Sequence, residues 1–140
     1  MNTRSFITGG LIAGIVYFFL GWLVFGILLA DTMRERMNEG LFRKEEDIIL
    51  WALIVGNVAY GFLLSYIFQN MGVENARRGS AVGATIGLVT SMTFDLSFFG
   101  TSTMYNDLVV ITFNITAFVV VSAITGSVLG LWLSRHSVKS

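Results

Sequence analysis

The sequence predicts an all-α membrane protein in which four transmembrane helices form an antiparallel, up-down-up-down bundle. Two observations support this fold class. The chain of 140 residues is 54% hydrophobic and 14% aromatic, and its mean hydropathy is +0.73, which is too apolar for an ordinary soluble domain of this size. Its charged residues lie almost entirely between four long apolar runs. We therefore expect a single transmembrane domain comprising residues 1–140.

Each of the four apolar runs is long enough to cross a bilayer. An α-helix rises about 1.5 Å per residue, so about 20 residues cross a hydrocarbon core of about 30 Å. The first run is about twice as long as the apolar core of a signal peptide, and we therefore interpret it as a span. The predicted spans are residues 6–30, 48–68, 79–99 and 108–133, with Asp95 as the only ionisable residue inside them.

The links between the spans are short, which predicts that sequential helices are neighbours running in opposite directions. In the longest link, residues 31–47, Met33, Met37 and Leu41 recur at every fourth position. This spacing predicts an interfacial amphipathic helix within residues 31–42. A solvated, charged loop interrupted at Gly40 is the alternative.

Lys and Arg are divided almost evenly between the two sides of the predicted bundle. The terminal segments and the second link carry five of them, and the first link carries four. Arg77 and Arg78 stand at the start of the third span, where the helix dipole disfavours cations, so topology is the better explanation for them. They favour a cytoplasmic location for both termini.

Small residues recur at every fourth position along the predicted spans. In a membrane such residues let two helix backbones approach closely, which is a main source of helix association. The stripe in the third span begins at Gly79 and ends at Asp95. The predicted packing positions are Gly10, Gly14, Gly61, Gly83, Gly87, Ser91, Ser122, Gly126 and Gly130.

The two halves of the chain also share a spacing of polar residues. Asn57 and Ser65 in the second span match Asn114 and Ser122 in the fourth. This match suggests a duplicated helical hairpin, of the kind that gives parallel repeats in some transporters. Membrane helices favour Asn, Ser and Gly in any case, so independent origins are the alternative.

Asp95 is the main candidate for chemistry. A carboxylate at the bilayer centre costs at least about 2.5 kcal/mol and is usually functional. The candidate members of a polar intramembrane cluster around it are Asn114, Asn57 and the indole N–H group of Trp22. Two interpretations stay open: a structural hydrogen-bond cluster, and a site for a proton, an ion or a ligand.

The composition argues against several other functions. The chain has no cysteine and a single histidine, His136, so we expect neither a metal site nor another cofactor. No histidine or lysine lies in a span to activate a hydroxyl group, so we do not expect an enzyme. Nine basic and nine acidic residues cancel, which argues against nucleic-acid binding.

Several short segments resemble a known group of proteins. The chain is similar to small four-span bacterial integral membrane proteins of unknown function. The resemblance implies the same four-span fold in a bacterial inner membrane, and it implies no catalytic or ligand-binding residues. The segments that carry it are Gly9-Gly10, residues 17–26, Gly56-Asn57-Val58-Ala59-Tyr60-Gly61, Phe94-Asp95-Leu96 and Gly100-Thr101.

Two functional classes are compatible with these features. The first is a non-catalytic membrane protein, either a small subunit or a bundle that binds lipid or a partner and packs through its glycine-rich helix faces. The second is an oligomeric proton- or cation-conducting channel or small transporter that uses Asp95. The expected partners are the lipid bilayer and either further copies of the chain or a larger membrane complex.

Overall fold

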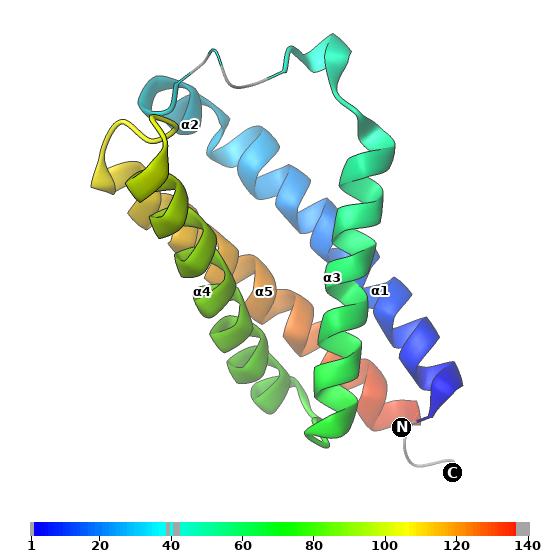
Figure 1. Ribbon diagram of the computed structural model, residues 1–140. Coiled ribbons are helices and arrows are strands. Elements are labelled where there is room, and N and C mark those ends of the chain that lie inside the picture. The colour runs from blue at the N-terminus through cyan, green and yellow to red at the C-terminus, as the bar shows by residue number, and fades with distance from the viewer. Residues whose placement is uncertain (1, 39, 41–42, 137–140) are drawn as a thin grey trace.

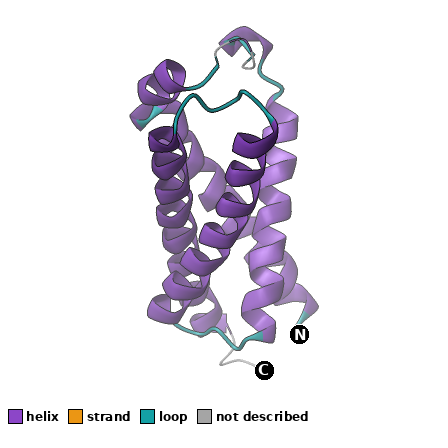
Figure 2. Ribbon diagram, turned by 60° about the vertical axis from the view of Figure 1, so that its left-hand side comes forward, coloured by secondary structure: helices purple, strands orange, loops and turns teal. Residues whose placement is uncertain are grey.

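The computed structural model describes residues 2–38, 40 and 43–136. Within them every regular element is helical (Figures 1 and 2). The elements are α1 (Thr3–Leu23), the π-helical turn η1 (Val24–Leu28), α2 (Ala30–Arg36), the 3-10 turn η3 (Glu45–Asp47), α3 (Leu50–Asn70), α4 (Ala76–Thr101) and α5 (Leu108–His136).

Four helices are long and apolar enough to cross a membrane, which confirms the predicted all-α class and the number of candidate spans. Helix α4 extends beyond the predicted span at both ends, so Asp95 lies six residues before its end, or about 9 Å along its axis. The four candidate spans are Thr3–Leu28, Leu50–Asn70, Ala76–Thr101 and Leu108–His136.

Local side-chain contacts set the ends of the helices. Asn75 begins α4 by accepting a hydrogen bond from the backbone N–H of Arg78, with an N···O distance of 2.8 Å, which satisfies one of the free donors of the first turn. Gly72, at φ +60°, ends α3 in a left-handed conformation. The Val73 N–H then donates to the Phe68 carbonyl at 2.9 Å, as in a Schellman cap. The turn from α3 to α4 is therefore tight.

Helix pairing does not simply follow chain order. Helix α1 packs along α3 and also contacts α5, and α4 packs along α5. The expectation that all sequential helices are neighbours is wrong for α3 and α4, which touch little beyond their shared turn and then diverge (Figure 1). The reason is that the closest approaches use glycine faces, and those faces join α1 to α3 and α4 to α5.

The α4–α5 contact is a seam of small residues. An added Cβ atom on Gly83 would collide with the Ser122 carbonyl oxygen, and one on Gly87 would lie 2.9 Å from the Phe118 carbonyl oxygen. In the α1–α3 seam, a Cβ atom on Gly14 would lie 2.8 Å from the Val58 Cα atom. All nine predicted packing positions are buried.

The two seams do not share a register. Ser65 donates a hydrogen bond to the Phe6 carbonyl at 3.0 Å, whereas its counterpart Ser122 lies against Gly83. In a duplicated hairpin, Gly10 and Gly14 of the first span would correspond to Gly79 and Gly83 of the third, yet Gly14 lies two turns further along α1 than Phe6. Both helix pairs therefore pack through small residues, but equivalent positions of the two pairs do not face equivalent partners.

The link after the first span folds against the bundle. Helix α2 is amphipathic, since Met33 is buried whereas Arg34 and Glu35 are exposed. It ends at Arg36, inside the segment 31–42 in which an amphipathic helix was predicted. Met37 leaves the helix and forms an antiparallel bridge with Tyr105. Leu41, the third member of the predicted stripe, lies outside the described residues.

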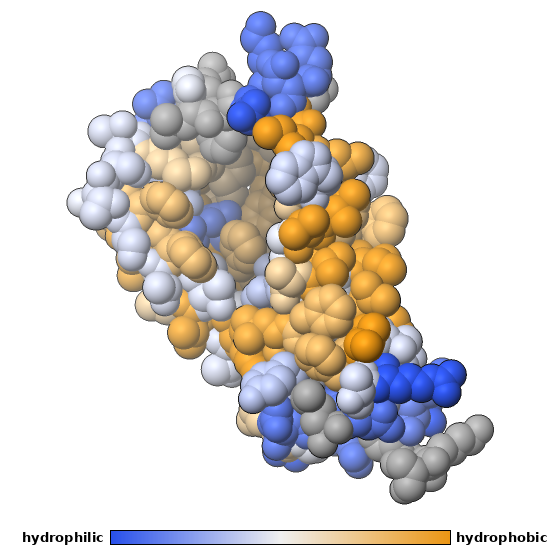
Figure 3. All heavy atoms as spheres, turned by 45° about the vertical axis from the view of Figure 1, so that its right-hand side comes forward, coloured by the Kyte–Doolittle hydropathy of each residue, from blue (hydrophilic) through white to orange (hydrophobic). Residues whose placement is uncertain are grey.

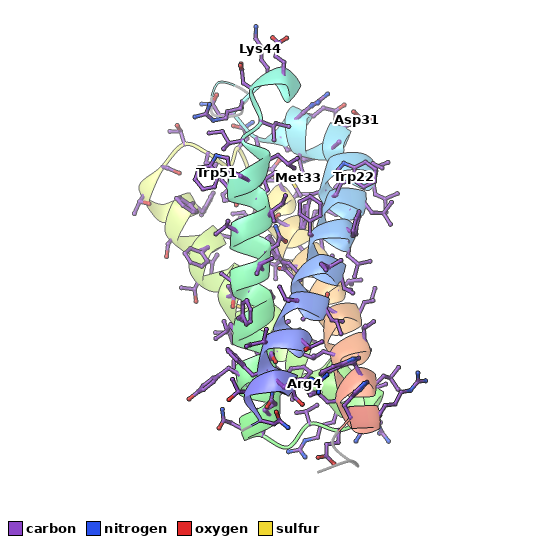
Figure 4. All side chains as sticks on the ribbon, turned by 90° about the vertical axis from the view of Figure 1, so that its right-hand side faces the viewer. Arg4, Trp22, Asp31, Met33, Lys44 and Trp51 are labelled. Carbon is purple, nitrogen blue, oxygen red and sulfur yellow. The ribbon has the colours of Figure 1, made fainter. Side chains whose placement is uncertain are left out.

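The middle of the molecule exposes apolar side chains, whereas charged residues gather at its two ends (Figure 3). The terminal end contains Arg4, the end of α5 and the α3–α4 turn; the loop end contains Asp31, Lys44 and the α4–α5 loop (Figures 1 and 4). Only 17% to 33% of the most apolar stretch of each long helix is buried. Large apolar side chains are exposed along all four long helices.

Candidate functional site

Asp95 is buried, with 4% of its surface exposed, and two neutral side chains bind its carboxylate. The Tyr105 hydroxyl donates a hydrogen bond to Asp95 Oδ1 at 2.7 Å. The Asn114 amide nitrogen donates to both carboxylate oxygens at 2.8 Å. Both carboxyl oxygens of Asp95 therefore have hydrogen-bond partners, one on the α4–α5 loop and one on α5.

Three elements bring these residues together. Asp95 lies on the small-residue face of α4, one turn after Ser91, and the close approach of α5 buries this face. Asn114 projects from α5, and Tyr105 lies in the connecting loop. Because the α4–α5 seam is tight, the two helices hold the carboxylate and the amide at hydrogen-bonding distance.

The loop that carries Tyr105 is fastened to the segment after α2. The Asn106 N–H donates to the Arg36 carbonyl and the Asn38 N–H to the Met104 carbonyl, both at 3.1 Å. Arg36 Nη1 also forms an ion pair of 2.8 Å with Asp107 Oδ2. These contacts from two links fix the position of the Tyr105 side chain.

Two pKa shifts in this loop agree with that arrangement. Burial, followed by the hydrogen bond to Asp95, raises the pKa of Tyr105 well above its usual value, so the hydroxyl stays protonated as a donor. The hydrogen bond from the Val110 N–H, followed by the contact with Arg36, lowers the pKa of Asp107 below its usual value of 3.8. Asp107 is thus an ionised cap at the start of α5.

Asp95, Tyr105 and Asn114 line a cavity of about 360 Å³. Figure 3 shows a hollow between α3 and the α4–α5 pair, with hydrophilic atoms at its base. The rest of the cavity wall is aromatic rings and methionine side chains, from η1, α2 and its following segment, α4, the α4–α5 loop and α5: Phe25, Met33, Met37, Phe94, Phe98, Met104 and Phe118.

The π-helical turn shapes one side of this cavity. The Leu29 N–H donates to the Val24 carbonyl, five residues back, at 2.8 Å, and such an extra residue rotates the side chains of a turn. The Phe25 ring packs on Phe118 with its centroid 4.9 Å away. The turn therefore joins the end of α1 to the cavity wall on α5.

Two of the predicted cluster members lie elsewhere. The Asn57 amide donates to the Leu53 carbonyl of its own helix at 2.7 Å, since α3 diverges from α4. Trp22 is 60% exposed and points away from the bundle (Figure 4). The structure thus brings Asp95 together with Asn114 but not with Asn57 or Trp22.

Sequence reasoning missed Tyr105, because it lies in a link rather than in a span. One signal could have indicated it. Tyr105 lies in a short link that directly follows the span whose small-residue stripe ends at Asp95.

A second polar cluster, also missed, lies where α1, α3 and α5 meet. Tyr60 Oη and Ser122 Oγ are 3.2 Å apart, and the Tyr17 and Tyr60 rings pack with centroids 4.4 Å apart. The buried Thr125 Oγ1 has no hydrogen-bond partner among the described residues. Ser122 was predicted only as a packing position, and Tyr17, Tyr60 and Thr125 lie within long apolar runs, which hid their polar role.

The described residues contain no group of three or more His, Cys, Asp or Glu side chains that could hold a metal ion. The chain matches no protein-family model, and neither a curated protein nor a solved structure is significantly similar to it. The resemblance to small four-span bacterial membrane proteins therefore stays a prediction. The function has to be argued from the cavity itself.

Proposed function

We propose that this chain is a non-catalytic, multi-pass membrane protein that binds a small amphiphilic molecule in the Asp95 cavity. Membrane insertion is supported by four apolar helices of sufficient length. It is also supported by the exposed hydroxyl groups of α4, such as Thr93 and Ser97, which donate to carbonyls one turn back at 2.7 and 2.6 Å. Such bonds leave no donor unpaired where a helix faces lipid.

An up-down-up-down arrangement of the spans belongs to this proposal. Along the α4–α5 seam, Gly79 lies against Gly126, Gly83 against Ser122 and Gly87 against Phe118, so the numbers rise on one helix as they fall on the other. We place both termini in the cytoplasm of a bacterial cell, with the chain in the inner membrane, as the Arg77–Arg78 pair and the family resemblance suggest.

The observation that carries the binding function is the buried carboxylate at the base of a half-open apolar cavity. A concave, mostly apolar site with a few convergent polar groups is the usual form of a small-molecule site. The cavity volume of about 360 Å³ lies within the range of about 300 to 1,000 Å³ that such sites occupy. The carboxylate gives one fixed point for orienting a ligand.

The same geometry supports binding over the other interpretations. Catalysis by a hydroxyl would need a base beside it, and the polar groups of the cavity are Asp95, Tyr105 and Asn114, with Asp95 already bound by the other two. Ion conduction would need a continuous polar path, whereas most of this wall is aromatic or methionine. The glycine faces pack within the chain, so the proposal does not rest on a protein partner.

A cavity-filling variant tests the binding function. The Met104 side chain lines the cavity, so Met104→Trp should fill it. Purified protein in a non-ionic detergent is heated with cationic, neutral and anionic amphiphiles, since a ligand that binds the folded state raises the melting temperature. At least one of them should raise the melting temperature of the wild type but not that of Met104→Trp. The binding function is wrong if every amphiphile acts equally on both proteins.

A further inference from the structure

We infer that the ligand of the Asp95 cavity is an organic monocation with an apolar body, such as a quaternary ammonium or phosphonium compound. The inference deepens the proposed binding function and rests on it. It follows from the charge at the base of the cavity, the chemistry of its wall and the place where it opens.

At the base of the cavity, Asp95 carries the acidic group, and no ion pair between it and a described Lys or Arg side chain is present. Both side chains that bind Asp95 are neutral, and together they donate three hydrogen bonds to its oxygens. At this end of the molecule Arg36 pairs with Asp107 instead. A carboxylate in apolar surroundings gains most from an opposite charge close by, so the cavity favours a cation over a neutral or an anionic molecule.

The wall selects the kind of cation. Aromatic faces attract cations through their quadrupole, and this attraction is strongest for cations that shed their water easily, such as quaternary ammonium ions. Phe25, Phe94, Phe98 and Phe118 line the same cavity as the carboxylate, and the methionine side chains of the wall add an adaptable apolar surface. An organic cation can contact all of these groups.

An inorganic cation would lack ligands in the same cavity. Calcium takes six to eight oxygen ligands, and magnesium needs a near-octahedral set. The side-chain oxygen atoms in the cavity wall belong to Asp95, Asn114 and Tyr105, and the Tyr105 hydroxyl donates to the carboxylate. The remaining wall of carbon and sulfur would leave a small, strongly hydrated ion without its shell.

The opening fits a ligand that arrives from the membrane. Figure 3 shows the hollow beside the apolar side chains of α3, and α3 makes few contacts with α4. No residue of α3 lines the cavity itself, whose wall includes Met104 and Tyr105 of the α4–α5 loop. The first turns of α3, residues 50–56, are exposed throughout. A molecule with an apolar body can partition into the bilayer and enter between the two helices without crossing the charged loops.

Three probes of similar shape and different charge test the inference: tetraphenylphosphonium, triphenylphosphine oxide and tetraphenylborate. Their binding to purified protein is measured by equilibrium dialysis in a non-ionic detergent, with empty micelles subtracted. Tetraphenylphosphonium should bind at least about tenfold more tightly than the neutral and anionic probes, as the loss of a charge contact of ordinary strength implies.

Two pairs of variants test the roles of the carboxylate and of the aromatic wall. Asp95→Asn keeps hydrogen-bonding capacity and should weaken tetraphenylphosphonium binding by about tenfold or more, whereas Asp31→Asn, the same change at the exposed start of α2, should not. Phe98→Leu should also weaken it, whereas Phe99→Leu, at a neighbouring position outside the cavity wall, should not.

The outcomes distinguish the two proposals. Equal binding of all three probes, blocked by Met104→Trp, would overturn the cation inference and leave the binding function standing. Tetraphenylphosphonium binding that survives both Asp95→Asn and Phe98→Leu would also overturn it, because the cation would then sit elsewhere. Both proposals fail if no probe binds and if no amphiphile raises the melting temperature of the wild type more than that of Met104→Trp.

Discussion

The carbonyl oxygen of Gly126 occupies the place where Gly79 would carry a Cβ atom, and the carbonyl oxygen of Gly79 does the same at Gly126. The two backbones are therefore in direct contact, and no side chain lies between them. This approach continues through Gly83 to Gly87 and brings Asn114 to Asp95. The seam thus positions the site as well as stabilising the helix pair.

The first prediction concerns this seam. Gly83→Ala should destabilise the protein by about 1 to 3 kcal/mol, because its Cβ atom would collide with the Ser122 carbonyl and force the helices apart. Gly56→Ala is the matched control, since no atom lies within 4 Å of the added Cβ atom. In the control the higher helix propensity of Ala should be neutral or stabilising, by up to about 1 kcal/mol. Unfolding by titration with a denaturing detergent measures both; equal effects would contradict the seam.

The second prediction concerns topology and uses the absence of cysteine from the chain. Thr3→Cys and Glu74→Cys place thiols at the terminal end, and Lys44→Cys and Thr103→Cys place them at the loop end. In intact membranes an impermeant thiol reagent should label one pair from one side and the other pair from the other side. Labelling after detergent solubilisation controls for reactivity. A terminal-end site that labels together with a loop-end site would show that the span count is wrong.

The third prediction concerns acid stability. The pKa of Asp107 is lowered in the folded state, so its ionised form stabilises the fold above the usual value of 3.8. This stabilisation should be lost as the pH falls through the folded-state pKa, which lies below that value. The melting temperature of the wild type should therefore fall more steeply below pH 4 than that of Asp107→Asn.

A second variant separates the causes of that pKa shift. The largest single cause is the hydrogen bond from the Val110 N–H, and Arg36 acts through both a hydrogen bond and its charge. Arg36→Gln should therefore keep part of the acid sensitivity that Asp107→Asn removes. If Arg36→Gln removes all of it, the ion pair rather than the helix cap is responsible.

Hydropathy and helix length were sufficient to predict the four candidate spans, because a long apolar run has few other stable states. The rarity of polar side chains inside the spans also indicated Asp95 and Asn114. The same argument was wrong for Asn57, because it does not determine which helices are neighbours, and the glycine faces join α3 to α1 rather than to α4.

Tyr105 and the π-helical turn could not be found in this way, because both depend on contacts distant in sequence. The position of Tyr105 depends on its bridge to Met37 and on the ion pair between Arg36 and Asp107. Hydropathy ranks residues by transfer into lipid, and it contains no information about such pairings between links.

The last prediction concerns the hydrogen bonds of Asp95. Asp95→Leu should destabilise the protein by about 1 to 3 kcal/mol, because the Tyr105 hydroxyl and the Asn114 amide would both lose their acceptor while buried. Asp95→Asn should be tolerated, since its amide oxygen still accepts hydrogen bonds. Tyr105→Phe should lie between them, because it removes one donor and leaves the bond from Asn114.

Thermal unfolding in detergent ranks the three variants, and Asp31→Leu at the exposed start of α2 controls for the loss of a carboxylate at the same end of the molecule. A tolerated Asp95→Leu would mean that the carboxylate does not organise the cavity. If Asp95→Asn unfolds as readily as Asp95→Leu, the charge itself is required for folding, and ligand binding then has to be tested with Phe98→Leu, which leaves the carboxylate in place.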